Sequence, residues 1–166
     1  MPTQLSHNEI KNTATNKEII VVADEMRSPE NVGMILRVSE AFGSKKVIFL
    51  GDSPTLEKRK VKRTSRSAEK GLAVSFNQLP QETIEDLKAR GFKLIGIEIT
   101  DNSSAIKEYD FSKINKLAVL IGNEKEGINS AILKQLDSIL HFDLFGKNSS
   151  INVVNALSVA LYEITR

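Results

Sequence analysis

Six short apolar runs of five to eight residues alternate along this 166-residue chain with segments of helical periodicity. Strands buried on both faces of a sheet are nearly continuous in apolar residues, and parallel strands need a crossover, usually a helix, between them. The pattern therefore predicts an α/β fold with a parallel, Rossmann-like sheet and with loops gathered at the carboxyl ends of its strands. The predicted strands cover residues 18–23, 46–51, 72–76, 92–99, 117–121 and 138–142.

Start and stop signals place the helices between these strands. Ser28 and Pro29 are typical of a helix cap and first turn, and Gly43 and Gly91 are typical of the residue that follows a helix. Residues 101–116 show no periodicity and predict a loop beside the sheet. The predicted helices cover residues 29–42, 81–90, 129–136 and 152–166.

Composition fits one domain with a core of its own, since 40% of the residues are hydrophobic. We expect a polar tail over residues 1–18 and a single domain over 19–166. The tail has no apolar segment typical of a secretory signal, and no run is long enough for a membrane span, so we expect a cytoplasmic protein without membrane contact. Cysteine is absent, and two histidines, His7 and His141, are too few for a zinc site, so we expect no metal.

Positive charge is concentrated in one stretch, residues 56–70. Seven basic and two acidic residues give it a net charge of +5, against +2 for the whole chain, so the remainder carries −3. A flexible basic stretch on a mildly acidic body is typical of a segment that follows a phosphate backbone. The alternative is a solvated loop with no ligand. The candidate RNA-binding residues of this stretch are Lys58, Arg59, Lys60, Lys62, Arg63 and Arg66.

Three motifs carry more information than the composition. Residues 31–37 read Asn-Val-Gly-Met-Ile-Leu-Arg and lead to Phe42-Gly43, residues 120–127 read Leu-Ile-Gly-Asn-Glu-Lys-Glu-Gly, and residues 146–156 open the last helix with small and polar side chains. In this order and spacing they resemble the three motifs of the SpoU (TrmH) family of RNA ribose 2′-O-methyltransferases, within the SPOUT superfamily. The resemblance spans residues 19–166.

The resemblance implies a fold, a reaction and partners. The fold is an α/β knot, in which the loops of motifs two and three form a deep trefoil knot. The reaction is transfer of the methyl group of S-adenosylmethionine to a ribose 2′-hydroxyl, with S-adenosylhomocysteine as the product. The implied partners are RNA, with transfer RNA our first expectation and ribosomal RNA the second, and another copy of the chain in a homodimer whose active site is completed across the subunits.

The resemblance also assigns residues to the cofactor. It implies a pocket held largely by backbone groups, with Gly122 allowing close approach of the backbone at the end of the 117–121 strand. Thr100 is a further candidate, placed by spacing alone at the end of an earlier strand. The remaining cofactor candidates are Phe142, Leu144, Ser150, Ile151 and Asn152.

The implied catalytic set is Arg37, Asn31, Glu124, Ser150 and Asn152. Arg37 stands at the arginine that the family uses in catalysis. A guanidinium has a pKa above about 12 and is a poor base, so we expect Arg37 to bind the target phosphate and to stabilise the developing alkoxide. Asn31 would fix the ribose or Arg37, and Glu124 would accept hydrogen bonds from the arginine.

The sequence departs from the family pattern in two places. Asp143 stands where a proline is usual, and Val154-Asn155 stands where Ser-Val is common. An RNA-binding protein of the same fold that has lost catalysis is therefore the alternative function. An unrelated nucleotide-binding domain is disfavoured, because the sequence has no Walker or dinucleotide-binding glycine motif.

The last helix bears on assembly. One apolar stripe is expected to contain Val153, Leu157, Ala160, Leu161 and Ile164, while Val154 and Ala156 extend apolar character around the helix. The sequence alone leaves open whether this second face packs in the core or against a partner.

Overall fold

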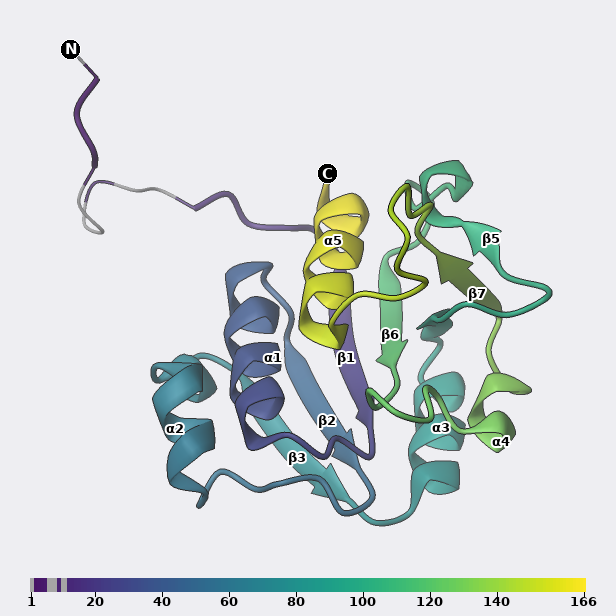
Figure 1. Ribbon diagram of the computed structural model, residues 1–166, viewed down its shortest axis with the longest axis horizontal. Helices are drawn as coiled ribbons and strands as arrows, with labels where there is room; N and C mark the ends of the chain where they lie inside the picture. Colours follow the sequence, from purple (N-terminus) through teal and green to yellow (C-terminus); the bar gives the residue numbers. More distant parts are fainter. Residues whose placement is uncertain (1, 6–8, 10–11) are drawn as a thin grey trace.

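The computed structural model describes residues 2–5, 9 and 12–166; His7 lies outside this part of the chain. Within it the chain forms a seven-stranded sheet in the order β3-β2-β1-β6-β4-β7-β5, and every neighbouring pair is parallel (Figure 1). The predicted parallel α/β fold is therefore confirmed. The strands are β1 (Glu18–Asp24), β2 (Lys46–Leu50), β3 (Ala73–Asn77), β4 (Lys93–Ile97), β5 (Ser104–Ala105), β6 (Lys116–Ile121) and β7 (Ser138–His141).

Helices cover both faces of the sheet. One face packs against α1 (Pro29–Ala41), α2 (Arg59–Ser65) and α5 (Val153–Thr165), and the other against α3 (Pro80–Ala89) and α4 (Ser130–Leu133). Two 3₁₀ helices, η2 (Ala68–Lys70) and η3 (Ile106–Glu108), complete the structure.

The two cores follow from the alternation of side chains along each strand. In β1, Ile19 and Val21 face the core below α1 and α5, whereas Ile20 and Val22 face the core below α3. All four side chains are at most 2% exposed. Because both faces of the central strands are covered, these strands are apolar at almost every position, which is the pattern that predicted them.

The residues predicted to begin and end α1 do so in the structure. Ser28 Oγ accepts a hydrogen bond from the Asn31 N–H, Pro29 opens the helix, and Gly43 follows it with a positive φ of 73°. The predicted 129–136 helix is wrong in length, because α4 has only four residues. The predicted loop at 101–116 is wrong in part, because it contains β5 and η3.

The basic stretch is not a flexible loop, and that prediction is corrected. Residues 59–65 form α2, which packs on α1 through the buried Val61 and Ser65. A Cβ at Gly33 of α1 would lie 1.9 Å from Thr64 Oγ1 and 2.5 Å from the Val61 carbonyl oxygen. The glycine thus lets the two helices meet closely, and the basic side chains are presented from an ordered helix.

The last helix buries a stripe that differs from the predicted one at its start. Val154, not Val153, is buried with Leu157, and the N-cap Asn152 accepts a hydrogen bond from the Val154 N–H at 2.8 Å. The opposite face leaves Val159 and Tyr162 exposed. In the described part of the chain, no helix is long and apolar enough to cross a membrane.

Candidate functional site

A cavity of about 390 Å³ lies where β4, β6 and β7 end. The carboxyl ends of parallel strands meet at one edge of a sheet, and ligands of open α/β sheets bind there. Its lining is divided between polar and apolar surface. The lining residues are Ile97, Glu98, Ile99, Gly122, Asn123, Glu124, Lys125, Glu126, Gly127, His141, Phe142, Leu144, Ser150, Ile151, Asn152, Val153 and Ala156.

One residue from each sequence motif meets beside this cavity. The Asn31 side-chain amide donates a hydrogen bond to Glu124 Oε1, and the Asn152 amide donates to Asn31 Oδ1 at 3.4 Å. These residues come from the first turn of α1, the loop after β6 and the N-cap of α5. The structure therefore brings together Asn31, Glu124 and Asn152, which are separated by up to 121 positions.

The loop after β6 is built from its own backbone contacts. The buried Asn123 side chain accepts hydrogen bonds from the N–H groups of Lys125 and Glu126, at 3.0 and 2.9 Å. A Cβ at Gly122 would lie 1.9 Å from the carbonyl carbon of Gly127 and 2.1 Å from the Ile128 nitrogen. We expected this glycine to admit a ligand; its first role in the structure is to admit the return of its own loop.

Glu98 was missed by sequence reasoning. Its carboxylate lines the cavity and accepts hydrogen bonds from the N–H groups of Ile99 and Ile128, at 3.0 and 3.2 Å. It therefore fastens the loop after β6 to the end of β4. The available signal was a single carboxylate directly after an apolar strand, at the edge where the other candidates gather.

Thr100 is not among the residues that line the cavity, so the structure does not bring it to the other cofactor candidates. It lies in a turn instead: its N–H donates to Ser103 Oγ at 3.1 Å and its hydroxyl donates to Asn102 Oδ1 at 2.8 Å. Ile99 occupies the wall of the cavity in its place. Thr100 therefore lies one residue beyond the part of the chain that lines the cavity after β4.

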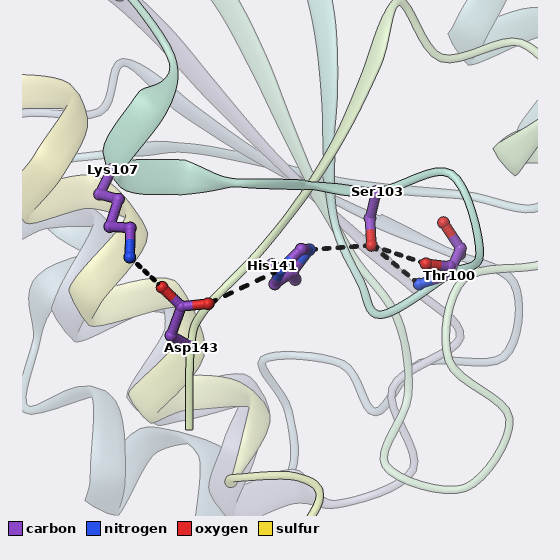
Figure 2. Close-up of polar contacts among 5 residues, drawn as sticks. All are labelled: Thr100, Ser103, Lys107, His141 and Asp143. Carbon is purple, nitrogen blue, oxygen red and sulfur yellow. Dashed lines mark hydrogen bonds and ion pairs between the residues drawn. The ribbon is translucent and has the colours of Figure 1, made fainter. Parts of the chain in front are cut away.

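The other cofactor candidates all lie on the cavity. Phe142 is half-buried, Leu144 and Ile151 are exposed, and Ser150 stands on the wall beside them. Asp143, at the position of the unusual substitution, is not among the lining residues, and its carboxylate faces Lys107 and His141 (Figure 2). The Lys107 ammonium holds the pKa of the Asp143 carboxyl below its usual range.

Arg37 lies apart from this group. It is exposed on α1 and lines a second cavity together with Arg66, Ser67 and Glu40. Glu124 bonds to Asn31 and not to Arg37, so the expected Glu124–Arg37 contact is not formed within one chain. Arg66 and Ser67 both have positive φ values, 50° and 69°, which non-glycine residues adopt at a cost in energy.

The basic side chains of α2 and its flanks are exposed, including Lys58, Arg59, Lys62 and Arg63. Lys60 forms an ion pair with Glu30 of α1 at 3.0 Å, and this contact lowers the pKa of the Glu30 carboxyl. The ion pair joins α2 to the first turn of α1, which also carries Asn31.

His141 ends β7, as the sequence predicted for a residue at the end of a strand. Its Nδ1 lies 3.0 Å from Ser103 Oγ. Among the residues that the structure describes, no group of three or more His, Asp or Glu side chains has the arrangement of a metal site.

Comparison with known proteins gives one family. The model of the SpoU rRNA Methylase family matches residues 18–162. The chain is 34% identical over 151 residues to the tRNA (guanosine(18)-2′-O)-methyltransferase TARBP1 of Mus musculus, covering 89% of this chain and 9% of that protein. It is 26% identical over 158 residues to the 23S rRNA (guanosine(2553)-2′-O)-methyltransferase RlmP of Bacillus subtilis, covering 95% and 62%. The chain thus spans less than two thirds of these relatives.

Solved structures agree with the sequence comparison. The SpoU methyltransferase AviRb from Streptomyces viridochromogenes, in complex with the cofactor AdoMet, superposes with a TM-score of 0.83 at 25% identity, covering 96% of this chain and 63% of that one. The A. aeolicus TrmH/SpoU tRNA modifying enzyme gives a TM-score of 0.80 at 23% identity, covering 90% and 74%. The second likeness concerns the fold alone.

Proposed function

The chain belongs to the SpoU rRNA Methylase family, and we propose that it transfers the methyl group of S-adenosylmethionine to a ribose 2′-hydroxyl of RNA. The meeting of Asn31, Glu124 and Asn152 beside the cavity carries this proposal. Three separate motifs converge on one small polar cluster next to a partly apolar cavity of a size that suits a nucleoside-containing ligand.

The residues present fit S-adenosylmethionine. Phe142, Leu144 and Ile151 offer apolar surface for the adenine and the methionine chain, and the backbone of the 122–127 loop offers donors and acceptors. Glu98 adds negative charge to the wall, which suits the positive sulfonium, whereas Glu126 pairs with Arg27. When bound, the cofactor supplies an electrophilic methyl group, and the walls hold it toward the polar cluster.

The polar cluster orients the acceptor. Asn31 is fixed on both sides, by Glu124 and by Asn152, so its amide is held in one direction. We assign the ribose contact to Asn31 and Asn152, with Ser150 on the adjoining wall. Glu124 keeps the Asn31 amide in place and adds an acceptor for the proton of a ribose hydroxyl.

Arg37 is assigned to the phosphate and to the charge that develops on the 2′-oxygen. Within one chain it faces a different cavity from the proposed cofactor site. We therefore infer a homodimer in which Arg37 of a second copy completes the site. Exposed apolar side chains support a partner surface along α5 and the loop before it: Phe145, Ile151, Val159 and Tyr162.

RNA contact is assigned to α2 and its flanks, whose lysines and arginines are exposed beside the α1 start. Transfer RNA is the first candidate substrate, since the mouse relative at 34% identity is named for tRNA, and ribosomal RNA is the second, since RlmP at 26% is named for 23S rRNA. We further infer the family's trefoil knot in the segments around residues 120–152, and a polar tail that precedes β1.

A catalytically inactive RNA-binding protein is the second candidate, favoured by Asp143 and Val154-Asn155 at positions that differ from the family pattern. Asn31, Arg37, Glu124, Ser150 and Asn152 are nevertheless all present, which favours catalysis.

The test is mass-spectrometric mapping of ribose methylation in RNA from cells with and without the gene, and from cells complemented with Arg37→Ala. The proposal predicts one 2′-O-methyl nucleotide that is lost with the gene and is not restored by the variant. Unchanged ribose methylation in both tRNA and rRNA would contradict it, and restoration by Arg37→Ala would contradict the role of Arg37.

A further inference from the structure

The loop over residues 143–151, which forms one wall of the cavity, makes few hydrogen bonds and ion pairs. Beyond the sheet pairing that ends at His141, residues 143–151 run to the α5 cap without regular structure, and all of them are exposed. In the described structure, the hydrogen bonds and ion pairs of this segment are made by Asp143 alone. Phe145, two positions on, is 96% exposed. The conformation of the wall therefore depends on how Asp143 is held.

Asp143 is held by Lys107 and lies beside His141. Its Oδ2 accepts a hydrogen bond from the Lys107 ammonium, and its Oδ1 lies 4.0 Å from His141 Nε2 (Figure 2). On the other side of the ring, His141 Nδ1 lies 3.0 Å from Ser103 Oγ. That hydroxyl gives its one proton to the Thr100 carbonyl at 2.8 Å, so the histidine Nδ1 must be the donor to it.

The sheet register explains why Lys107 meets Asp143. β5 pairs with β7 in parallel, with Ala105 opposite His141. Two residues beyond this pair, Lys107 lies in η3 and Asp143 follows the end of β7, and there the Lys107 ammonium donates a hydrogen bond to Asp143 Oδ2. The short β5 strand and η3 thus deliver a lysine to the position where the wall of the cavity begins.

We propose that Asp143 is a positioning residue, which fixes the cofactor wall over residues 142–151 through its ion pair with Lys107. The inference rests on the proposed function, since it assigns Asp143 to the binding of S-adenosylmethionine. The family pattern has a proline at this position, and a proline also restricts the chain there by fixing φ. The Asp143 N–H donates no hydrogen bond in the described structure, so a proline removes none.

The Lys107–Asp143 ion pair restricts the loop over residues 143–151 but contributes little to the stability of the whole protein. The Lys107 and Asp143 side chains are 63% and 36% exposed, and exposed ion pairs contribute little to the free energy of unfolding. The pKa of Lys107 is raised and that of Asp143 lowered by their contact, so both groups stay charged through neutral pH. Its effect is therefore expected in the affinity for the cofactor.

The experiment measures S-adenosylmethionine affinity by calorimetry, with thermal unfolding and kcat at saturating cofactor alongside. Asp143→Ala should weaken affinity roughly three- to tenfold, the cost of ordering a loop on binding, with the unfolding midpoint and kcat unchanged. Asp143→Pro should retain affinity within about twofold, because the proline restores the restriction by another route. Asp110→Ala is the matched control, an exposed carboxylate that caps Ser112 and does not touch the loop.

A charge exchange isolates the ion pair. Lys107→Asp alone places two carboxylates opposite each other and should weaken affinity at least as much as Asp143→Ala. Combining Lys107→Asp with Asp143→Lys should recover most of the loss. Affinity of Asp143→Ala equal to wild type, or a loss matched by a lower unfolding midpoint, would overturn the positioning role. A wild-type protein that binds no S-adenosylmethionine would instead contradict the proposed function itself.

Discussion

The cavity at the ends of β4, β6 and β7 and the basic surface of α2 serve the same proposed reaction but are built in opposite ways. The cavity stands on strands whose side chains are almost wholly buried, and its walls are shaped by backbone contacts such as that between Gly122 and Gly127. The α2 surface stands on one short helix, anchored by Val61 and Ser65, with its charges in solvent. Shape determines binding in the first region, and charge determines it in the second.

This difference has physical consequences for ligands. Contacts in the cavity act at van der Waals and hydrogen-bond range, so they tolerate salt and fail when an atom is misplaced. Contacts of exposed lysines and arginines with phosphates are long-range, additive and screened by salt. Substitutions in the two regions should therefore fail in distinguishable ways.

Gly122→Val should have the largest effect, because its side chain meets the backbone of Gly127 and Ile128 and cannot be accommodated by a rotamer change. We expect S-adenosylmethionine affinity to fall by about a hundredfold or more and the unfolding midpoint to fall with it. Calorimetry and thermal unfolding measure both. Gly146→Ala, with nothing within 4 Å of its Cβ, is the control. If Gly122→Val folds and binds S-adenosylmethionine with wild-type affinity, the assignment of this cavity to the cofactor is wrong.

Arg37→Ala should come next, and it separates chemistry from cofactor binding. Loss of one charge-stabilising contact at a preorganised site typically costs about a hundredfold in rate. Arg37 does not line the cofactor cavity, so cofactor affinity should be unchanged. Single-turnover methylation measures the rate, and Arg90→Ala, whose side chain pairs with Asp86 on α3, is the control. Undiminished turnover would remove Arg37 from the mechanism.

Neutralising Lys58, Arg59, Lys60 and Lys62 together should weaken RNA binding roughly tenfold near physiological salt and flatten the dependence of affinity on salt. Turnover at saturating RNA should be largely preserved, since the cavity is untouched. Lys60 is expected to contribute least, because it already pairs with Glu30. The control removes the same number of charges elsewhere, at Lys45, Lys88, Lys113 and Lys134. Equal losses in both variants would show that net charge, and not the α2 surface, binds RNA.

The smallest expected effect is a change in stability that comes from Asp24, a buried carboxylate at the end of β1. Burial raises the pKa of Asp24, which ends β1 and accepts a hydrogen bond from the Asn129 N–H at 2.8 Å. A raised pKa in the folded state means that this group's contribution to stability is present at low pH and is lost as pH rises through the folded-state pKa. Asp24→Asn keeps an acceptor without the charge.

Thermal unfolding between pH 4 and 7 should therefore show a higher midpoint for Asp24→Asn at pH 7, with a gap that closes toward pH 4. Asp52→Asn, exposed in the loop after β2, should show no such trend. A midpoint below wild type at pH 7 would mean that the charge on Asp24 is needed.

The strands of the sheet could be predicted from the sequence, because a strand that is buried on both faces is a continuous run of apolar residues. The 117–121 run and Ser28-Pro29 each determined a local structure through local chemistry. The basic stretch was wrongly predicted to be a flexible loop. Its many charged residues gave no sign that Val61 and Ser65 pack against another helix, and this packing depends on Gly33 in that helix. Burial set by a distant partner is not visible in local composition.

The site was readable only in part for a similar reason. Asn31, Glu124 and Asn152 were predicted as site residues from the motifs, and in the structure their side chains are joined by hydrogen bonds. Glu98 and the Lys107–Asp143 contact were missed, because each depends on the register of strands far apart in sequence. Within one chain Arg37 lies away from the cavity, and its proposed role depends on the homodimer that we infer.

The most direct test of the central claim is methyl transfer by the purified protein. The protein is incubated with S-adenosylmethionine carrying a labelled methyl group and with tRNA and rRNA, and the nucleosides are then resolved by mass spectrometry. The account predicts label in a 2′-O-methyl nucleoside and none with Arg37→Ala. Cofactor binding without any labelled ribose, or label found on a base alone, would contradict it.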